Sequence, residues 1–189
     1  MHDEEEMSMI IDLAKEHMDK AIEHLQNELM KVRTGKASPA MLNGLMVSYY
    51  GNPTPLNQVA NVTVSDSRTI AIQPWEKSMI QHIERAIFEA NLGVSPQNDG
   101  EMIRLSIPPL TEERRKEMVK RTKTMGEETK VGIRSARRQA MEDIKKAIKE
   151  GYPEDAGKQK EAVVQTLTDD YSKKVDHIIE VKDKEIMTI

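Results

Sequence analysis

The sequence of 189 residues contains no cysteine, one tryptophan, one phenylalanine and no long apolar run. The absence of cysteine excludes disulfides, thiol catalysis and cysteine-ligated metal centres. No apolar stretch approaches the roughly 20 residues that a membrane-spanning helix needs. Aromatic residues make up only 3% of the chain, whereas charged residues make up 32%. This composition indicates a helix-rich protein with a thin apolar core.

The first residues, Met1-His2-Asp3-Glu4-Glu5-Glu6, are acidic. Secretory and organellar targeting segments are basic at this place. We therefore expect a protein that carries no targeting segment and that works in the cytoplasm.

Charge is distributed unevenly along the chain. The formal net charge is only -4, yet residues 104–149 hold 14 basic and 7 acidic side chains, while residues 1–30 hold 2 and 9. Half of the 28 lysines and arginines thus lie in one segment, which suggests an element that contacts a polyanion. A helix whose charges pair with acidic neighbours of the same chain would give the same count. Charge alone leaves both interpretations open.

Three segments each carry one apolar stripe at helical spacing. We predict helices over about residues 8–33, 111–150 and 154–186, because apolar residues recur there every three or four positions. Thr111 is the predicted N-cap of the second helix, and Gly151-Tyr152-Pro153 is the predicted end. Three such helices form an elongated bundle.

Between the first two of these helices the pattern changes to short β-branched runs. They predict strands over residues 45–50, 59–64, 69–73, 94–97 and 102–107, a helix over about 78–91, and a turn over 51–55. The predicted class is α+β: an elongated three-helix bundle of residues 1–34 and 109–189, with a small β/α/β domain of residues 35–108 inserted between the first two long helices. Because two connections join the predicted domains, we expect a hinge between them.

No motif for catalysis or metal binding is complete. The segment Thr34-Gly35-Lys36-Ala37-Ser38 resembles the end of a phosphate loop, but it lacks the upstream glycine and the hydroxyl residue after the lysine, and it follows a helix instead of a strand. His17 and His24 lie about 10 Å apart along a helix, too far for one metal ion. We expect no catalytic residue, no metal site and no cofactor, and therefore a protein that is not an enzyme.

The most distinctive cluster of side chains lies on the second long helix. Arg134, Arg137 and Arg138 stand at i, i+3 and i+4, so their guanidinium groups share a face. Planar guanidinium donors suit phosphates, and a row of them along a rod suits structured RNA. A solvated, salt-bridged helix face is the alternative. The candidate RNA-binding residues are Arg114, Arg115, Lys120, Lys130, Arg134, Arg137 and Arg138.

Longer motifs carry a resemblance to a known family. They are Lys31–Pro39 (KVRTGKASP), Tyr49–Leu56 (YYGNPTPL), Asp66–Arg68 (DSR), Asn91–Gly93 (NLG), Pro108–Lys116 (PPLTEERRK) and Ile133–Arg138 (IRSARR). On these residues the chain resembles the ribosome recycling factor family, in order and over nearly its whole length. One departure is Lys36, which stands where many members carry arginine. Lysine keeps the charge but lacks the paired donors of a guanidinium group.

The resemblance implies an L-shaped monomer that binds the post-termination ribosome between its subunits. With elongation factor G, which hydrolyses GTP, such a factor splits the ribosome and releases messenger RNA and deacylated transfer RNA. The resemblance also implies that the bundle lies on large-subunit ribosomal RNA, with Arg137 at the position of an important family arginine. It further implies that the inserted domain swings about a hinge near residues 34–37 and 107–109. The residues of this hinge are Thr34, Gly35, Lys36, Ala37, Ile107, Pro108 and Pro109. A structural or chaperone-like helical adaptor for protein partners is the alternative from another class. Strong salt dependence of binding to ribosomal RNA would separate the two.

Overall fold

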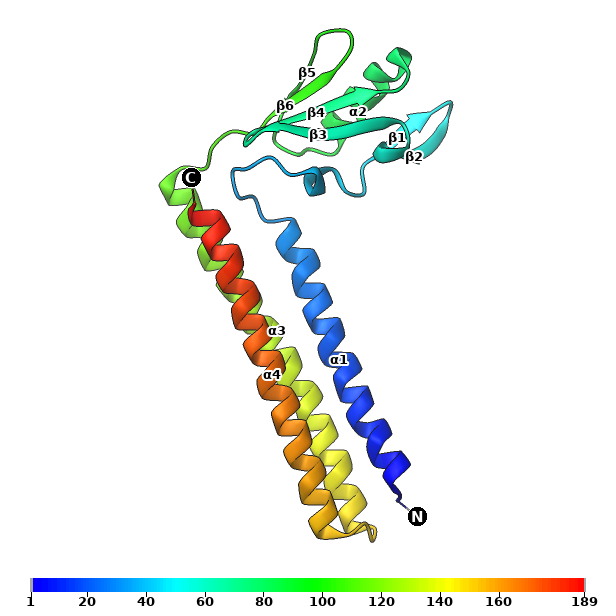
Figure 1. Cartoon of the computed structure of the whole chain (residues 1–189), viewed down its shortest axis with the longest axis vertical. Coiled ribbons are helices and arrows are strands. Elements are labelled where there is room, and N and C mark those ends of the chain that lie inside the picture. Colours follow the sequence, from blue (N-terminus) through cyan, green and yellow to red (C-terminus); the bar gives the residue numbers. More distant parts are fainter. Residues whose placement is uncertain (1, 189) are drawn as a thin grey trace. The chain divides into compact units, whose positions relative to one another are not determined.

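The structure, a computed structural model, describes residues 2–188 and confirms the α+β class (Figure 1). The helices are α1 (Glu4–Met30), α2 (Ile80–Glu89), α3 (Glu112–Lys149) and α4 (Glu154–Met187). The strands are β1 (Met46–Tyr49), β2 (Asn52–Pro55), β3 (Ala60–Asp66), β4 (Thr69–Pro74), β5 (Pro96–Asn98) and β6 (Ile103–Ser106). Short 3-10 helices span Pro39–Leu42, Leu56–Gln58 and Lys77–Met79.

The chain divides into two compact units. The helical unit combines the residues up to Val32 with those from Lys116 onward, and the inserted unit runs from Arg33 to Arg115. The chain therefore passes from the helical unit to the inserted unit and back. No helix of residues 2–188 is both long and apolar enough to cross a membrane.

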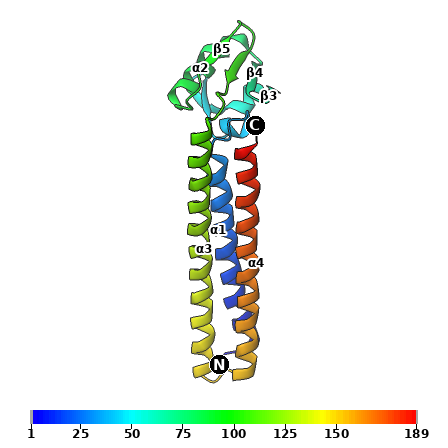
Figure 2. The same cartoon turned by 90° about the vertical axis from the view of Figure 1, so that its left-hand side faces the viewer.

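In the helical unit α1, α3 and α4 lie side by side, as Figures 1 and 2 show from two directions. Side-chain contacts give their directions. Glu4 near the start of α1 pairs with Lys160 near the start of α4, and Asp19 further along accepts a hydrogen bond from Tyr171, so these helices are parallel. Thr122 bonds to Asp183 at 2.6 Å, while Arg137 bonds to Gln165 at 2.7 Å, so α3 and α4 are antiparallel.

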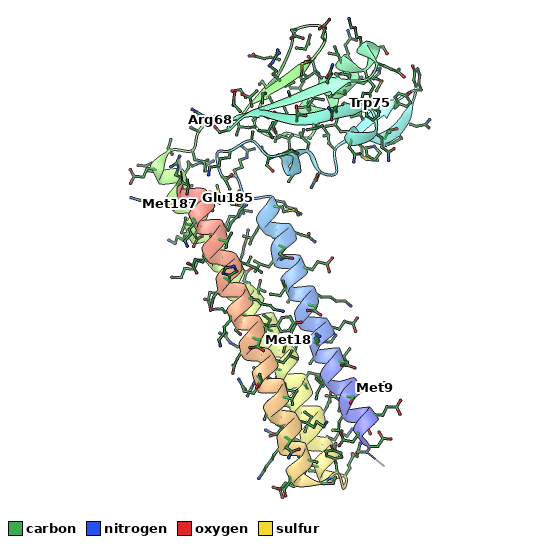
Figure 3. All side chains as sticks on the ribbon, in the orientation of Figure 1. Met9, Met18, Arg68, Trp75, Glu185 and Met187 are labelled. Atoms are coloured by element: carbon green, nitrogen blue, oxygen red, sulfur yellow. The ribbon has the colours of Figure 1, made fainter. Side chains whose placement is uncertain are left out.

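The core residues of α1 recur on one face of the helix. The buried positions are Met7, Ala14, Met18, Leu25 and Leu29. Their separations of seven and four residues correspond to about two turns and one turn, as in helices that pack side by side in bundles. Met18 is fully buried, whereas Met9 on the same helix is exposed (Figure 3).

Tyr171 places a hydroxyl group within this core. The hydroxyl of Tyr171 donates a hydrogen bond to Asp19. Burial, and then this neighbouring carboxylate, raise the pKa of Tyr171 to about 12. The phenol is therefore protonated at neutral pH and ties α4 to α1.

The inserted unit is built on a four-stranded antiparallel sheet in the order β3-β4-β6-β5. One face of this sheet contributes Ile70, Ile72, Ile103 and Leu105, each with no exposed surface. These side chains form one core with the buried face of α2. The inserted unit thus has its own apolar core, separate from the two clusters of the helical unit.

The prediction of a turn over residues 51–55 is wrong. Residues 52–55 form strand β2, which pairs with β1 in a separate two-stranded sheet. The turn is shorter and consists of Tyr50 and Gly51, both of which have positive φ, at 49° and 81°. Prolines are tolerated in β2 because an edge strand does not need every N–H in the ladder. Pro53 and Pro55 alternate with Asn52 and Thr54, so both missing donors fall on the same side of the strand.

Helix α1 begins at Glu4, four residues before the predicted start. The Asp3 carboxylate accepts the N–H of Glu6 at 2.9 Å, and three glutamates follow in the first turn, where the helix dipole favours negative charge. The acidic start is therefore part of the helix. It lies at the same end of the bundle as the turn between α3 and α4 (Figure 2), where Glu4 accepts a hydrogen bond from the Tyr152 hydroxyl at 2.6 Å.

His2 provides a pH-dependent contact at this end. One ring nitrogen lies 2.8 Å from Glu6, and the other contacts Glu150, which directly follows the end of α3. Hydrogen bonds to Glu150, and then to Glu6, raise the pKa of His2 above its ordinary value of 6.5. A raised pKa in the folded state means that the stabilisation is complete below pH 6.5 and disappears as the pH rises through the folded value.

We therefore expect His2→Gln to lower the melting temperature at pH 5.5 and to have little effect at pH 9. Thermal unfolding of both proteins across this range measures the difference. A difference that is constant from pH 5.5 to pH 9 would show that the histidine charge is not involved.

Candidate nucleic-acid interface

The basic helix α3 starts with a side-chain cap. The hydroxyl of Thr111 accepts the N–H of Arg114 at 3.2 Å, the contact expected of an N-cap residue with the third helical position. Arg114 is exposed, whereas Arg115 is half-buried. The Nε of Arg115 is buried and has no hydrogen-bond partner among residues 2–188. Of these two predicted RNA-binding residues, Arg114 is the better placed to reach a partner in solution.

The three central arginines differ in their surroundings. Arg134 and Arg138 are exposed, while Arg137 is half-buried on the side of α3 that faces α4. The Nε of Arg137 donates to Gln165 at 2.7 Å, and the amide of Gln165 donates in turn to Asp169 at 2.9 Å. This chain of hydrogen bonds uses one of the five donors of the guanidinium group. It fixes the orientation of Arg137 and leaves the two terminal nitrogens for an external acceptor.

Lys130 is placed differently from the other predicted residues. Its ammonium group pairs with Asp176 of α4 and lies 3.9 Å from Glu127. Only 17% of the side chain is exposed. The charge of Lys130 is thus compensated within the bundle, so it contributes less to an external polyanion site than the exposed arginines do.

A basic stripe runs along the exposed face of α3. At about 100° per residue, its members fall within about 60° of one another on the helix circumference. The stripe consists of Lys116, Lys120, Lys123, Arg134, Arg138 and Lys145, all of them exposed. Lys116, Lys123 and Lys145 are absent from the predicted RNA-binding set, although the 3.6-residue period alone places them on this face. Glu127 is the acidic residue that lies within the stripe.

The ion pairs of the basic residues test whether α3 is a helix face whose charges pair within the chain. Within residues 2–188, no ion pair forms at Lys120, Arg134, Arg137 or Arg138. In this part of the chain, no carboxylate therefore pairs directly with these positive charges. This distribution favours an external anionic partner over a self-paired helix face.

The two connections of the inserted unit contact each other. Gly35 has a φ of 76°, and a Cβ added there would lie 3.1 Å from the backbone nitrogen of Leu110. Thr34 is buried, and Lys36 is half-buried. Little space is thus left for any larger residue at position 35.

Both connections are also fixed to the turn between β3 and β4. The N–H of Ala37 donates to Ser67 at 2.8 Å, and the N–H of Ile107 donates to Arg68 at 2.7 Å. The turn itself is held by Asp66, whose carboxylate accepts the N–H of Arg68 at 2.9 Å. This bond, followed by one from Thr69, lowers the pKa of Asp66 below its ordinary value. Ala37 and Ile107 are therefore anchored in the inserted unit, at the turn that carries Arg68; Figure 3 labels Arg68.

Comparisons with known proteins match one family over nearly the whole chain. The family model "Ribosome recycling factor" matches residues 25–187. A ribosome-recycling factor of Porphyromonas gingivalis is 51% identical over 185 residues, which cover 97% of this chain and 100% of the relative. That of Cytophaga hutchinsonii is 52% identical, with 98% and 100% covered.

Solved structures are similar as well. A solution structure of a ribosome recycling factor is 38% identical, covers 100% of both chains and has a TM-score of 0.84. The Thermus thermophilus ribosome recycling factor, described with Escherichia coli elongation factor G bound to the E. coli post-termination complex, is 42% identical over 96% of this chain and 99% of the other, with a TM-score of 0.66.

The fold and the match to the family model define the class of this protein, which is a translation factor that is not itself an enzyme. The chain belongs to the ribosome recycling factor family.

Proposed function

We propose that this protein recycles ribosomes after termination. It binds the post-termination ribosome in the cytoplasm and, together with elongation factor G and GTP, separates the subunits so that messenger RNA and deacylated transfer RNA leave. The observation that carries this proposal is the match to recycling factors over nearly the whole chain. A relative described with elongation factor G on the post-termination complex supports the same partners.

The anchor in this mechanism is the exposed face of α3. Arg134 and Arg138 are exposed and form no ion pair with the described residues 2–188, and Arg137 is oriented by Gln165. Guanidinium forks bind phosphate oxygens with two parallel hydrogen bonds. Side chains cannot read the bases in the deep, narrow major groove of an RNA helix, so its phosphates and 2′-hydroxyls are the main features that a protein contacts. We assign to these arginines the contact with large-subunit ribosomal RNA.

The moving part is the inserted unit. Because the N–H groups of Ala37 and Ile107 are bonded to the β3–β4 turn, we assign the pivot to the residues between these anchors and the helices. The pivot then comprises Thr34, Gly35 and Lys36 on one connection and Pro108 and Pro109 on the other. Elongation factor G would drive motion at this pivot, and the motion would disrupt the bridges between the ribosomal subunits.

Light scattering of post-termination ribosomes tests the proposal. With elongation factor G and GTP present, we expect a fall in scattering that requires this protein. We expect Arg137→Ala to slow the fall, because loss of a charged hydrogen bond weakens affinity by about 1–3 kcal/mol. If scattering stays constant with an elongation factor shown to be active, the protein is instead a helical adaptor for protein partners.

A substitution at Gly35 tests the pivot. Gly35→Ala places a Cβ 3.1 Å from Leu110 at a φ of 76°, which costs about 1–2 kcal/mol for a residue other than glycine. We expect ribosome binding to be retained and splitting to slow about fivefold, because the connection has fewer conformations available. Gly44→Ala is the matched control, since Gly44 also has positive φ, at 80°, and nothing lies within 4 Å of its added Cβ. Equal splitting rates for the two variants would rule out a pivot at Gly35.

A further inference from the structure

The tip of the β1–β2 hairpin carries a tyrosine where local structure does not favour one. Tyr50 has a φ of 49° and is followed by Gly51 at 81°. Two-residue turns with positive φ at both positions prefer asparagine or aspartate followed by glycine. A bulky side chain in this conformation is a conformational outlier. Tyr50 also remains 74% exposed, so burial does not compensate for the strain.

One carboxylate holds this tyrosine and its neighbour in place. The hydroxyl of Tyr50 donates to Glu76 Oε2 at 2.8 Å, and that of Tyr49 donates to Oε1 at 2.9 Å. The two rings meet edge to face, with centroids 4.6 Å apart and planes at 78°. Hydrogen bonding to Glu76 raises the pKa of both phenols, so both remain protonated donors at neutral pH. The exposed Tyr50 ring is therefore ordered in advance of any contact.

The charge of Glu76 is not paired with a cation in the described part of the chain. Among residues 2–188 no lysine, arginine or histidine pairs with its carboxylate, and the adjacent Lys77 lies 3.5 Å from Glu101 instead. Trp75, directly before Glu76, is 65% exposed (Figure 3). Exposed tyrosine and tryptophan side chains are the types that supply most of the binding energy in protein interfaces.

We propose that Tyr50 and Glu76 form a docking site for a protein segment that presents an arginine or lysine side chain. The cation would lie on the face of the Tyr50 ring and pair with the Glu76 carboxylate, with Tyr49 as the positioning residue. Aromatic rings attract cations through their negative faces, and Glu76 supplies the complementary charge. Because the same carboxylate repels phosphate groups, the site selects a protein segment and not a nucleic acid. The inference rests on the proposed function, since the partner is a protein of the recycling complex.

Two variants separate docking from folding. Tyr50→Asn supplies the residue that the turn prefers, so we expect an unchanged or higher melting temperature together with splitting that is about tenfold slower. Glu76→Gln keeps a hydrogen-bond acceptor and removes the charge, and we expect a similar loss. Phe88→Ala is the control, because Phe88 is an exposed aromatic residue of α2 in the same unit, at 61% exposure, and it should split ribosomes at the wild-type rate. The wild-type rate in the same assay reports the proposed function independently.

Photo-cross-linking identifies the occupant. Tyr50 is replaced by benzoylphenylalanine in the full chain, and the protein is irradiated with purified ribosomes, elongation factor G and a non-hydrolysable GTP analogue. We expect a cross-link to a peptide of a ribosomal protein or of the elongation factor, next to an arginine or lysine. A cross-link only to ribosomal RNA, no cross-link while the wild-type protein splits ribosomes, or wild-type splitting by both Tyr50→Asn and Glu76→Gln would each overturn the proposal.

Discussion

Replacing Arg134, Arg137 and Arg138 together by glutamine is expected to weaken binding to the large ribosomal subunit at least a hundredfold, or about 3 kcal/mol. These arginines form no ion pair within residues 2–188, so their charges are available to phosphate groups. Each phosphate contact that is lost also reduces the release of counterions. A plot of log affinity against log salt concentration has a negative slope, and the magnitude of this slope should therefore decrease by about 2–3. Binding measured at several salt concentrations gives both quantities.

A control must show that the loss of affinity depends on where the arginines lie and not on the net charge of the protein. A control with Lys15, Lys158 and Lys173 replaced by glutamine removes the same charge from exposed sites on α1 and α4. We expect this control to change affinity less than threefold, and both triple variants to keep the melting temperature, because glutamine has nearly the same helix propensity as arginine and lysine. If the two triple variants lose affinity equally, α3 is not the anchor and general electrostatic attraction accounts for binding.

Ile133→Ala is expected to destabilise the helical unit by about 3 kcal/mol, although Ile133 is the direct neighbour of Arg134. The side chain has no exposed surface and belongs to the same core cluster as Met18, Leu25 and Val175. Truncating a buried isoleucine removes apolar contacts and leaves a cavity that the surrounding helices fill only in part. The melting temperature should fall by about 10 °C, as calorimetry or circular dichroism would measure.

Val131→Ala is the matched control for Ile133→Ala. Val131 lies on the same helix but is 60% exposed, so its truncation should change the free energy of unfolding by less than about 0.5 kcal/mol. A similar loss of stability in both variants would mean that the helix itself, and not the packed core, is sensitive to substitution. Below the melting temperature of Ile133→Ala, its affinity for the large subunit should match that of the unmodified protein.

Much of the helical unit follows from the sequence alone. Apolar residues at steps of three and four predict α1, α3 and α4, because a helix buries one stripe whatever it packs against. Thr111 was identifiable as a cap from its hydroxyl and from the two glutamates that follow. The clustering of Arg134, Arg137 and Arg138 is likewise local, since helical geometry fixes the neighbours of each position.

The hairpin of β1 and β2 could not be predicted in the same way. Prolines at 53 and 55 indicate a turn by composition, and a tyrosine at position 50 is a poor signal for the tight turn that is present. Strand pairing overrides these local preferences because the prolines fall on one side of an edge strand. The hydrogen bonds from the two tyrosines to Glu76 join residues that are 26 and 27 positions apart. A local sequence pattern cannot predict contacts over this distance in the chain.

The sequence by itself determined the α+β class, the helices and the face on which the basic residues of α3 gather, because these depend on periodicity within single elements. The tertiary structure alone decided which of those charges remain available. Lys130 pairs with Asp176 and Arg137 is held by Gln165, while Arg134 and Arg138 stay exposed. The partners on α4 are 46 and 28 positions away in the chain, and they meet α3 only through the antiparallel register that the packed core imposes.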